Sequence, residues 1–226
     1  MQEDQIILID KPANISSFGV VAKVRAHLRD QFGHKVKVGH TGTLDPFATG
    51  LLILLTGKNT KKSYDFLKLD KVYEATLKLG YTSTTGDPEG KIQKYEGGKA
   101  PKDVSLVLNS FIGTIEQTPP KFSAIKVGGQ RAYKLARQNQ DFKIPSRKVE
   151  IYSIKILAYN YPELKIRTHV SSGTYIRTLA EDIGKKLGTG AYLTDLRRTK
   201  IANYSVKDAL PLSNFTTKNK SKICYN

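Results

Sequence analysis

One carboxylate, Asp45, lies in a stretch whose composition could present it for chemistry. Residues 39–57 read GHTGTLDPFATGLLILLTG, with Gly42, Pro46 and Gly50 close to the acid. These residues favour an irregular but fixed backbone, and the apolar run at residues 51–55 predicts a buried strand that anchors the loop. A carboxylate held in this way can act as a nucleophile or accept a proton. Asp-Pro also occurs in plain turns, so the dipeptide alone would not indicate a site.

The first part of the chain reads as elements that hold this loop. Residues 6–9 form a strand-like apolar run, and Ser16 or Ser17 is expected to cap the helix that follows. In that helix three valines and Leu28 recur on one face, which predicts packing against a core. A short helix is expected near residues 59–69.

The middle of the chain reads mainly as strands. Residues 71–80 alternate apolar and polar side chains, which predicts a strand with Tyr73 facing inward. A helix is expected around residues 102–111. Strands near residues 148–158 and 163–170 suit an antiparallel hairpin, because the link between them is short. Together these elements predict an α+β fold, in which a mixed, mainly antiparallel sheet has helices on its faces.

A further helix, predicted over residues 174–187, places Arg177 in its first turn. Helix starts favour anions, so a cation there needs a partner. A carboxylate such as Asp45 would serve, and an ordinary surface arginine is the plainer alternative.

The chain is strongly basic. Its 226 residues hold 37 Lys and Arg against 20 Asp and Glu, a net charge of +17. An extended polyanion is the natural partner of such an excess, although a biased composition also produces basic chains. Between residues 118 and 148, eight basic residues accompany a single acid, Asp141, with Phe122 and Tyr133 interleaved. This segment is therefore predicted to grip phosphates.

Composition also sets aside several classes of protein. No apolar run approaches the length of a membrane span, and the polar start lacks the features of a secretory signal, so a cytoplasmic protein is expected. The only cysteine, Cys224, leaves no intrachain disulfide. The four histidines show no metal-ligand spacing. A mechanism without metal or cofactor is therefore expected.

Five strings along the chain resemble, in order, motifs of the bacterial tRNA pseudouridine synthase B family. They are DKPANISSF from residue 10, HTGTLDPFATGLL from residue 40, KVYEATLKLG from residue 71, PPKFSAIKVGGQRAYKLAR from residue 119 and SSGTYIRTLAEDIG from residue 171. One short motif would be weak evidence, whereas five in order cover nearly the whole chain. The resemblance implies the pseudouridine synthase fold, with residues 118–148 as an inserted basic RNA-contacting element.

The resemblance also implies a role for each site residue. Asp45 matches the catalytic aspartate, and Arg177 matches its ion partner, which keeps a buried carboxylate ionised. Residues expected to contact the substrate are His40, Tyr73, Tyr175, Arg177 and Leu196. Among them Tyr73 and Leu196 line the pocket for the flipped base, and His40 helps to fill the space around flipped nucleotides.

Eight basic side chains are expected to contact the RNA backbone. They are Lys11, Lys71, Arg131, Lys134, Arg137, Arg147, Arg197 and Arg198. For Lys71 a solvated lysine is the plainer alternative. Strand neighbours alternate faces, so at most one of Arg197 and Arg198 can share the face of Leu196.

The family's reaction isomerises the uridine at position 55 in the T-loop of tRNA. The bond from ribose C1′ to uracil N1 breaks, the base turns while it is held, and C1′ joins C5. No cofactor is required. One carboxylate could attack the sugar, attack the base or remove a ribose proton, and the sequence leaves these three routes open.

The same resemblance bears on domains and partners. Residues 1–208 are expected to form the catalytic domain. Residues 209–226 are expected to form a short basic tail in place of the additional C-terminal RNA-binding domain that is usual in the family. The expected partner is tRNA, through its T-arm stem-loop. The resemblance implies a monomer. No guide RNA is expected, because a guide-dependent relative would carry further domains.

Two other classes of function stay open at this stage. An RNA-binding or tRNA-folding factor could keep the scaffold without turnover, although binding alone has no need of Asp45, Tyr73 and Arg177 together. A glycoside hydrolase or base-removing enzyme usually pairs two carboxylates, and no second one lies in a comparable motif. Release of free base would indicate the latter.

Overall fold

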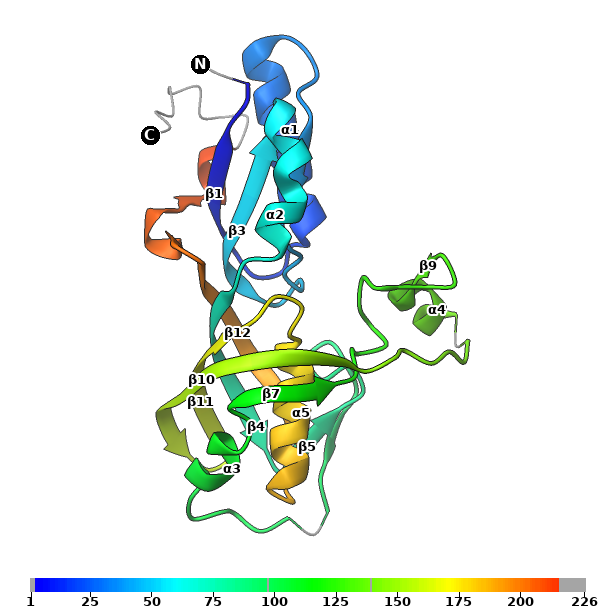
Figure 1. Ribbon diagram of the computed structural model, residues 1–226, viewed down its shortest axis with the longest axis vertical. Helices are drawn as coiled ribbons and strands as arrows, with labels where there is room; N and C mark the ends of the chain where they lie inside the picture. The colour runs from blue at the N-terminus through cyan, green and yellow to red at the C-terminus, as the bar shows by residue number, and fades with distance from the viewer. Residues whose placement is uncertain (1–2, 97, 139, 216–226) are drawn as a thin grey trace. The chain divides into compact units, whose positions relative to one another are not determined.

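The computed structural model describes residues 3–96, 98–138 and 140–215, and it divides into two compact units (Figure 1). The first unit contains residues 1–73 and 196–226, and the second contains residues 74–195. Two strands, β4 (Lys71–Leu79) and β12 (Ala191–Ile201), continue from one unit into the other. Cys224 and the end of the predicted basic tail lie outside the described residues.

The first unit is built on a sheet with the strand order β14-β1-β3-β12, in which β2 also pairs with β3 and β13 with β12. Its elements are β1 (Ile6–Lys11), α1 (Ser17–Phe32), β2 (Val38–His40), β3 (Thr49–Thr56), η1 (Gly57–Lys62), α2 (Ser63–Leu67), β13 (Tyr204–Ser205), η2 (Val206–Asp208), β14 (Leu210–Pro211) and η3 (Leu212–Phe215). β3 runs antiparallel to β1 and β2 and parallel to β12.

Strand β3 is buried on both faces, as its unbroken apolar run predicts. Leu52 and Leu54 pack into one core with α1 and β1. Their neighbours Leu51, Ile53 and Leu55 belong to a second core on the opposite face, against which Phe66 of α2 packs. Because strand side chains alternate, one apolar strand anchors both layers of this unit.

Helix α1 forms where the sequence predicts it. Ser16 caps its start, because its Oγ accepts a hydrogen bond from the backbone N–H of Gly19 at 3.0 Å. Gly33 ends the helix in the left-handed conformation with φ +77°. The three valines and Leu28 are buried against β1 and β3, which confirms the predicted face.

The second unit is built on a sheet with the strand order β12-β4-β11-β10-β7. Its further elements are β5 (Tyr81–Ser83), β6 (Ile92–Lys94), α3 (Ser105–Asn109), β7 (Gly113–Gln117), β8 (Lys126–Val127), β9 (Gln130–Arg131), α4 (Ala132–Arg137), β10 (Arg147–Asn160), β11 (Glu163–Val170) and α5 (Ile176–Lys186). β10 and β11 form the predicted antiparallel hairpin, and β10 also pairs antiparallel with β7. The mixed, mainly antiparallel α+β class is confirmed.

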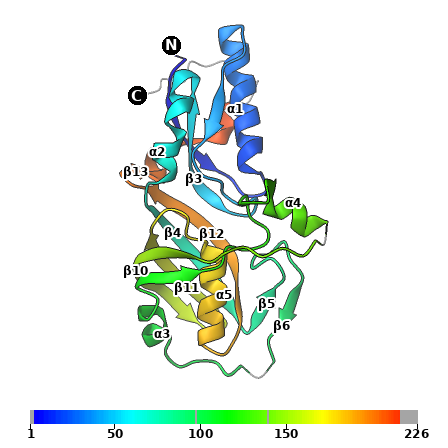
Figure 2. The same cartoon turned by 45° about the vertical axis from the view of Figure 1, so that its right-hand side comes forward.

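Helix α5 lies along one face of the second unit's sheet in both views (Figures 1 and 2). Ile176, Leu179 and Ile183 on its inner face are buried, as the predicted apolar stripe requires. β9 and α4, from the basic segment at residues 118–148, stand to the side of this sheet in Figure 1. Between residues 3 and 215, leaving out residues 97 and 139, no helix is long and apolar enough to cross a membrane.

Two predicted boundaries differ from the structure. The helix expected around residues 102–111 is the single turn α3, because Asp103 Oδ1 accepts the Ser105 N–H at 2.8 Å and the next strand begins at Gly113. The folded chain also continues past residue 208. β14 pairs with β1, and Phe215 is buried in the core beside α1.

Candidate active site

The loop that carries Asp45 connects β2 to β3 and is clamped by the start of α1. The Leu44 N–H donates to Ser17 Oγ at 2.8 Å, and that hydroxyl donates to the Leu44 carbonyl at 2.9 Å. After the acid, the Ala48 N–H closes a turn on the Asp45 carbonyl at 3.1 Å. The backbone on both sides of the half-buried Asp45 is therefore fixed by hydrogen bonds.

Lys11, the last residue of β1, also holds the Asp45 loop. Its ammonium donates to the carbonyls of Pro12, Ile15 and Pro46 at 2.9, 2.7 and 3.1 Å, and its side chain is fully buried. Because an enclosed ammonium cannot reach a phosphate, the predicted RNA-backbone contact of Lys11 is corrected to a structural role. The bond to the Pro46 carbonyl fixes the backbone directly after Asp45.

Arg198 supports the loop from β12. Its Nε donates to the Leu51 carbonyl at 2.8 Å and its Nη2 to the Gly42 carbonyl at 3.1 Å, and it is 1% exposed. Because Arg198 is buried, its predicted RNA-backbone contact is also corrected to a structural role. The strands meet so closely that a Cβ at Gly50, which has φ +102°, would lie 2.3 Å from the Arg198 carbonyl oxygen. Glycine is therefore required at this crossing.

Leu196 and Arg198 share the buried face of β12, and Arg197 lies on the other face, as alternation predicts. Arg197 forms a two-pronged ion pair with Asp10, at 2.7 and 3.1 Å. Both of these side chains keep about a third of their surface exposed, at 36% and 34%. A backbone contact from Arg197 therefore stays a prediction.

Burial lowers the pKa of the His40 imidazole below 6.5, and the charge of Arg198 lowers it further. The imidazole is thus neutral near pH 7. The Gly42 N–H donates to His40 Nδ1 at 3.4 Å, which fits a neutral ring. A neutral ring suits the predicted packing against unstacked nucleotides, because its aromatic face carries no charge to desolvate.

Lys71 is enclosed at the start of β4. Its ammonium donates to the carbonyls of Leu67, at 2.8 Å, and Leu69, and only 7% of the residue is exposed. Burial lowers its pKa to about 8, Arg198 lowers it as well, and Asp70 opposes the shift. The predicted phosphate contact of Lys71 is corrected for the same reason as that of Lys11.

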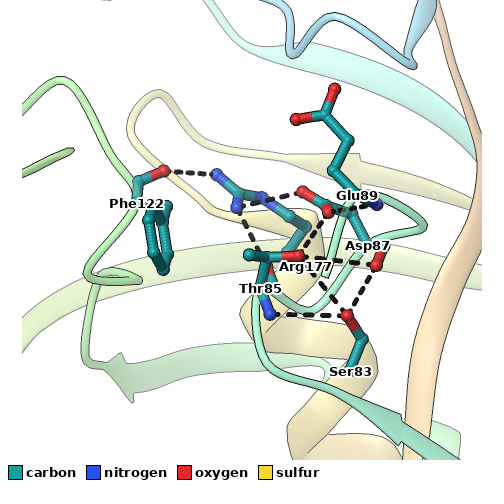
Figure 3. Close-up of polar contacts among 6 residues, drawn as sticks. All are labelled: Ser83, Thr85, Asp87, Glu89, Phe122 and Arg177. Carbon is teal, nitrogen blue, oxygen red and sulfur yellow. Dashed lines mark hydrogen bonds and ion pairs between the residues drawn. The ribbon is translucent and has the colours of Figure 1, made fainter. Parts of the chain in front are cut away.

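In the second unit, Arg177 sits in a hydrogen-bond network with Asp87 and two backbone carbonyls (Figure 3). Its Nη1 donates to the Thr85 carbonyl at 3.0 Å and to Asp87 Oδ2 at 3.2 Å, and its Nη2 donates to the Phe122 carbonyl at 2.8 Å. The side chains of Arg177 and Asp87 are each 5% exposed. A carboxylate thus offsets a cation that lies against the dipole of α5.

Asp87 is itself fixed by its neighbours. The Thr85 hydroxyl and the Glu89 N–H donate to Asp87 Oδ1 at 2.5 and 3.0 Å, and the Ser83 hydroxyl donates to the Asp87 carbonyl at 2.6 Å (Figure 3). The sequence analysis missed Asp87, because an acid between Gly86 and Pro88 reads as an ordinary turn residue. Asp45 belongs to the other unit, so its pairing with Arg177 stays a prediction.

Glu181 lies one turn after Arg177 in α5 and borders the same network. Burial raises the pKa of its carboxyl, Arg177 lowers it, and Asp182 and Asp87 raise it. A Cβ at Gly86, which has φ +73°, would lie 2.4 Å from Glu181 Oε1. Gly86 therefore leaves the space that this carboxyl occupies.

Tyr175 is held at the N-cap position of α5. The Tyr175 N–H donates to Gln117 Oε1 at 2.8 Å, and Gln117 Nε2 donates back to the Tyr175 carbonyl at 3.1 Å. The guanidinium of Arg147 lies 5.1 Å from the centre of the Tyr175 ring and donates to the Gly173 carbonyl. Gln117, which is 1% exposed, is a second positioning residue that the sequence analysis missed.

The other predicted residues divide into buried and exposed groups. Tyr73 is 8% exposed and faces inward, which confirms its predicted orientation, although its role in a pocket stays a prediction. Arg131, Lys134 and Arg137 are exposed on β9 and α4, where phosphate could reach them.

Within the part of the chain that the structure describes, no cluster of three or more His, Cys, Asp or Glu side chains could hold a metal ion.

Comparison with protein families decides the affiliation of the chain. Residues 29–176 match the model described as TruB family pseudouridylate synthase (N terminal domain). The chain belongs to the TruB family of pseudouridylate synthases. The recognition from sequence motifs is confirmed. Residues 177–221 match the tRNA pseudouridylate synthase B C-terminal domain, a match that includes much of the segment predicted as a tail.

Relatives of the TruB family align along almost the entire chain. The tRNA pseudouridine synthase B of Phocaeicola vulgatus is 45% identical over 95% of this chain and 92% of the relative. That of Aquifex aeolicus is 45% identical over 94% of this chain and 73% of its own length. A chain in the crystal structure of a Cbf5-Nop10-Gar1 complex superposes with a TM-score of 0.72 at 29% identity, over 94% of this chain and 53% of that one.

Proposed function

We propose that this TruB-family chain is a tRNA pseudouridine synthase that converts uridine 55 in the T-loop into pseudouridine, with Asp45 as the catalytic carboxylate. The observation that carries the proposal is the clamped Asp45 loop. Ser17, Lys11 and Arg198 fix it with hydrogen bonds from three different elements. The relatives named tRNA pseudouridine synthase B support tRNA as the substrate.

The proposed reaction is an isomerisation that consumes no cofactor. The bond from C1′ to N1 breaks, a bond from C1′ to C5 forms, the C5 proton passes to solvent and N1 gains a proton. Asp45 attacks the sugar, attacks the base or removes a ribose proton, and each route needs a fixed, ionised carboxylate. Such fixing lowers the cost of orienting the acid in the transition state.

The remaining site residues receive the substrate in this proposal. Tyr73 and Leu196 line an apolar pocket for the flipped base, Tyr175 contacts the substrate, and Arg177 stabilises the charge of Asp45. The neutral His40 packs against a flipped nucleotide. Cations that reach the surface complete the RNA contact: Arg131, Lys134 and Arg137 are exposed, and Arg147 and Arg197 are partly exposed. We propose that the enzyme works as a cytoplasmic monomer without guide RNA.

Tritium release from uracil C5 tests the proposal. The substrate is a T-arm stem-loop labelled at C5 of its uridines, and the parallel substrate has cytidine at position 55. We expect release from the wild-type protein on the uridine substrate only, and at least about a 100-fold lower rate for Asp45→Asn. Asp30→Asn, which changes an exposed acid on α1, is the matched control and should retain the wild-type rate.

Each outcome has a clear reading. Turnover that survives Asp45→Asn would refute the assignment of the catalytic residue. Release from the substrate that carries cytidine 55 would refute the position. Tight RNA binding with no release from the wild-type protein would favour a tRNA-folding factor instead, and free uracil would indicate a base-removing enzyme.

A further inference from the structure

An exposed aromatic ring stands at the first turn of α1, next to the clamp of the Asp45 loop. Phe18 is 65% exposed although it follows Ser17, which is buried and bound to Leu44. The three valines of the helix face the core, so Phe18 takes no part in that packing. Exposed apolar residues are common, and exposure alone would not mark a site.

A cation accompanies this ring. The Arg25 guanidinium lies 6.0 Å from the centre of the Phe18 ring, at the outer limit of a cation–π contact. Arg25 Nη2 also donates to the Val38 carbonyl of β2 at 3.1 Å. That bond ties the guanidinium to the strand that ends at His40. Phe18 and Arg25 are thus connected through β2 to the start of the Asp45 loop, and through Ser17 to Leu44, the residue before Asp45.

The stretch of chain that contains Phe18 and Arg25 is basic. Residues 17–40 contain five Lys and Arg against a single acid, Asp30. Asp30 is paired with Arg29 at 2.9 Å, so it neutralises a neighbour and not Arg25. An exposed aromatic face in a basic surface suits an unpaired nucleotide, because the base can stack while the cations offset its phosphates. An acidic or apolar protein partner would leave one of these two features unused.

We propose that Phe18 and Arg25 form a stacking shelf that holds one unpaired base of the RNA substrate beside the Asp45 loop. This inference rests on the proposed function for its substrate. The shelf binds through a ring face and a cation, so it is tolerant of base identity. It contributes to holding the RNA and takes no part in bond breaking.

The first test measures RNA affinity and turnover for Phe18→Ala. Loss of one base–aromatic stack should weaken the Kd for the T-arm stem-loop about tenfold, with kcat at saturating RNA within about twofold of wild type. Phe18→Tyr, which restores a ring, should recover the wild-type Kd. Leu106→Ala is the matched control, since Leu106 is an exposed apolar residue of α3 in the second unit, at 81% exposure, and should bind RNA as the wild type does.

The second test identifies the base. Abasic substitutions are placed at each unpaired nucleotide of the stem-loop in turn and are measured against wild type and Phe18→Ala. At one position the abasic RNA should bind the wild type about tenfold more weakly, yet bind Phe18→Ala no more weakly than intact RNA does. Additive losses at every position would overturn the shelf.

Three further results separate the possibilities. An unchanged Kd for Phe18→Ala overturns the shelf even if the wild-type protein makes pseudouridine. A change of sedimentation in Phe18→Ala with an unchanged Kd would assign this surface to contacts between copies of the chain, and also overturns it. If the wild type has no turnover but its RNA affinity still depends on Phe18, the proposed function fails and the shelf stands.

Discussion

Replacing Asp87 with Asn removes the negative charge from the buried pair with Arg177 while keeping the side-chain volume. Both partners are 5% exposed, and their Nη1–Oδ2 distance is 3.2 Å. Removing one partner of such a pair costs about 3–5 kcal/mol, because the remaining buried charge loses this pairing. Arg177 keeps the bonds to the Thr85 and Phe122 carbonyls, so we expect the lower end, about 3 kcal/mol.

Urea unfolding followed by circular dichroism measures this loss. With a slope of about 2 kcal/mol per molar urea, the midpoint should fall by roughly 1.5 M. Asp30→Asn is the matched control, because its pair with Arg29 is exposed, at 47% and 58%, and should change stability by no more than about 0.5 kcal/mol. Asp10→Asn breaks the half-exposed pair with Arg197 and should fall between them, near 1 kcal/mol.

The order of the three variants is the point of the experiment. If the free energies of unfolding of Asp87→Asn and Asp30→Asn differ by less than about 1 kcal/mol, burial does not govern the strength of these pairs and the reasoning fails. An Asp10→Asn variant less stable than Asp87→Asn would contradict it equally. Equal slopes for all variants are required for the comparison, because a changed slope signals a changed unfolding reaction.

Two further predictions concern the loop of Asp45. Gly50→Ala should cost at least about 3 kcal/mol in urea unfolding, since its Cβ would overlap the Arg198 carbonyl oxygen and its φ is +102°. Gly33→Ala is the control, because Gly33 has φ +77° but open space around it, and it should cost only about 1 kcal/mol. If the two variants lose the same stability, the overlap at Gly50 does not add to the cost and the prediction is wrong. The folded pKa of His40 lies below 6.5, so the unfolded chain binds more protons and wild-type stability should fall as pH drops below about 6.5. The free energy of unfolding of His40→Gln should fall less than that of the wild type between pH 7.5 and 5. If the two proteins lose stability in parallel over this range, the lowered pKa of His40 is refuted.

Local pattern was enough for most elements of the fold. The alternation over residues 71–80 gave β4, and the buried run before Gly57 gave β3, because side-chain period depends only on local backbone geometry. α3 came out shorter than predicted, since Asp103 starts its single turn by a side-chain contact. The first and last residues of a helix or strand depend on such individual hydrogen bonds, and the hydrophobic periodicity of the sequence does not predict these bonds.

The sequence by itself determined the family, the strands and helices, and the choice of Asp45 as the candidate acid, since motifs and periods are properties of short segments. Tertiary structure alone decided which charges are enclosed. Lys11, Lys71 and Arg198 count as basic residues in the sequence, yet each is buried with its donors on backbone carbonyls. Arg198 meets Leu51 across 147 residues, and Arg177 meets Asp87 across 90. Burial arises from segments far apart in the chain, so the sum of charges could indicate a polyanion but not which cations are free to reach it.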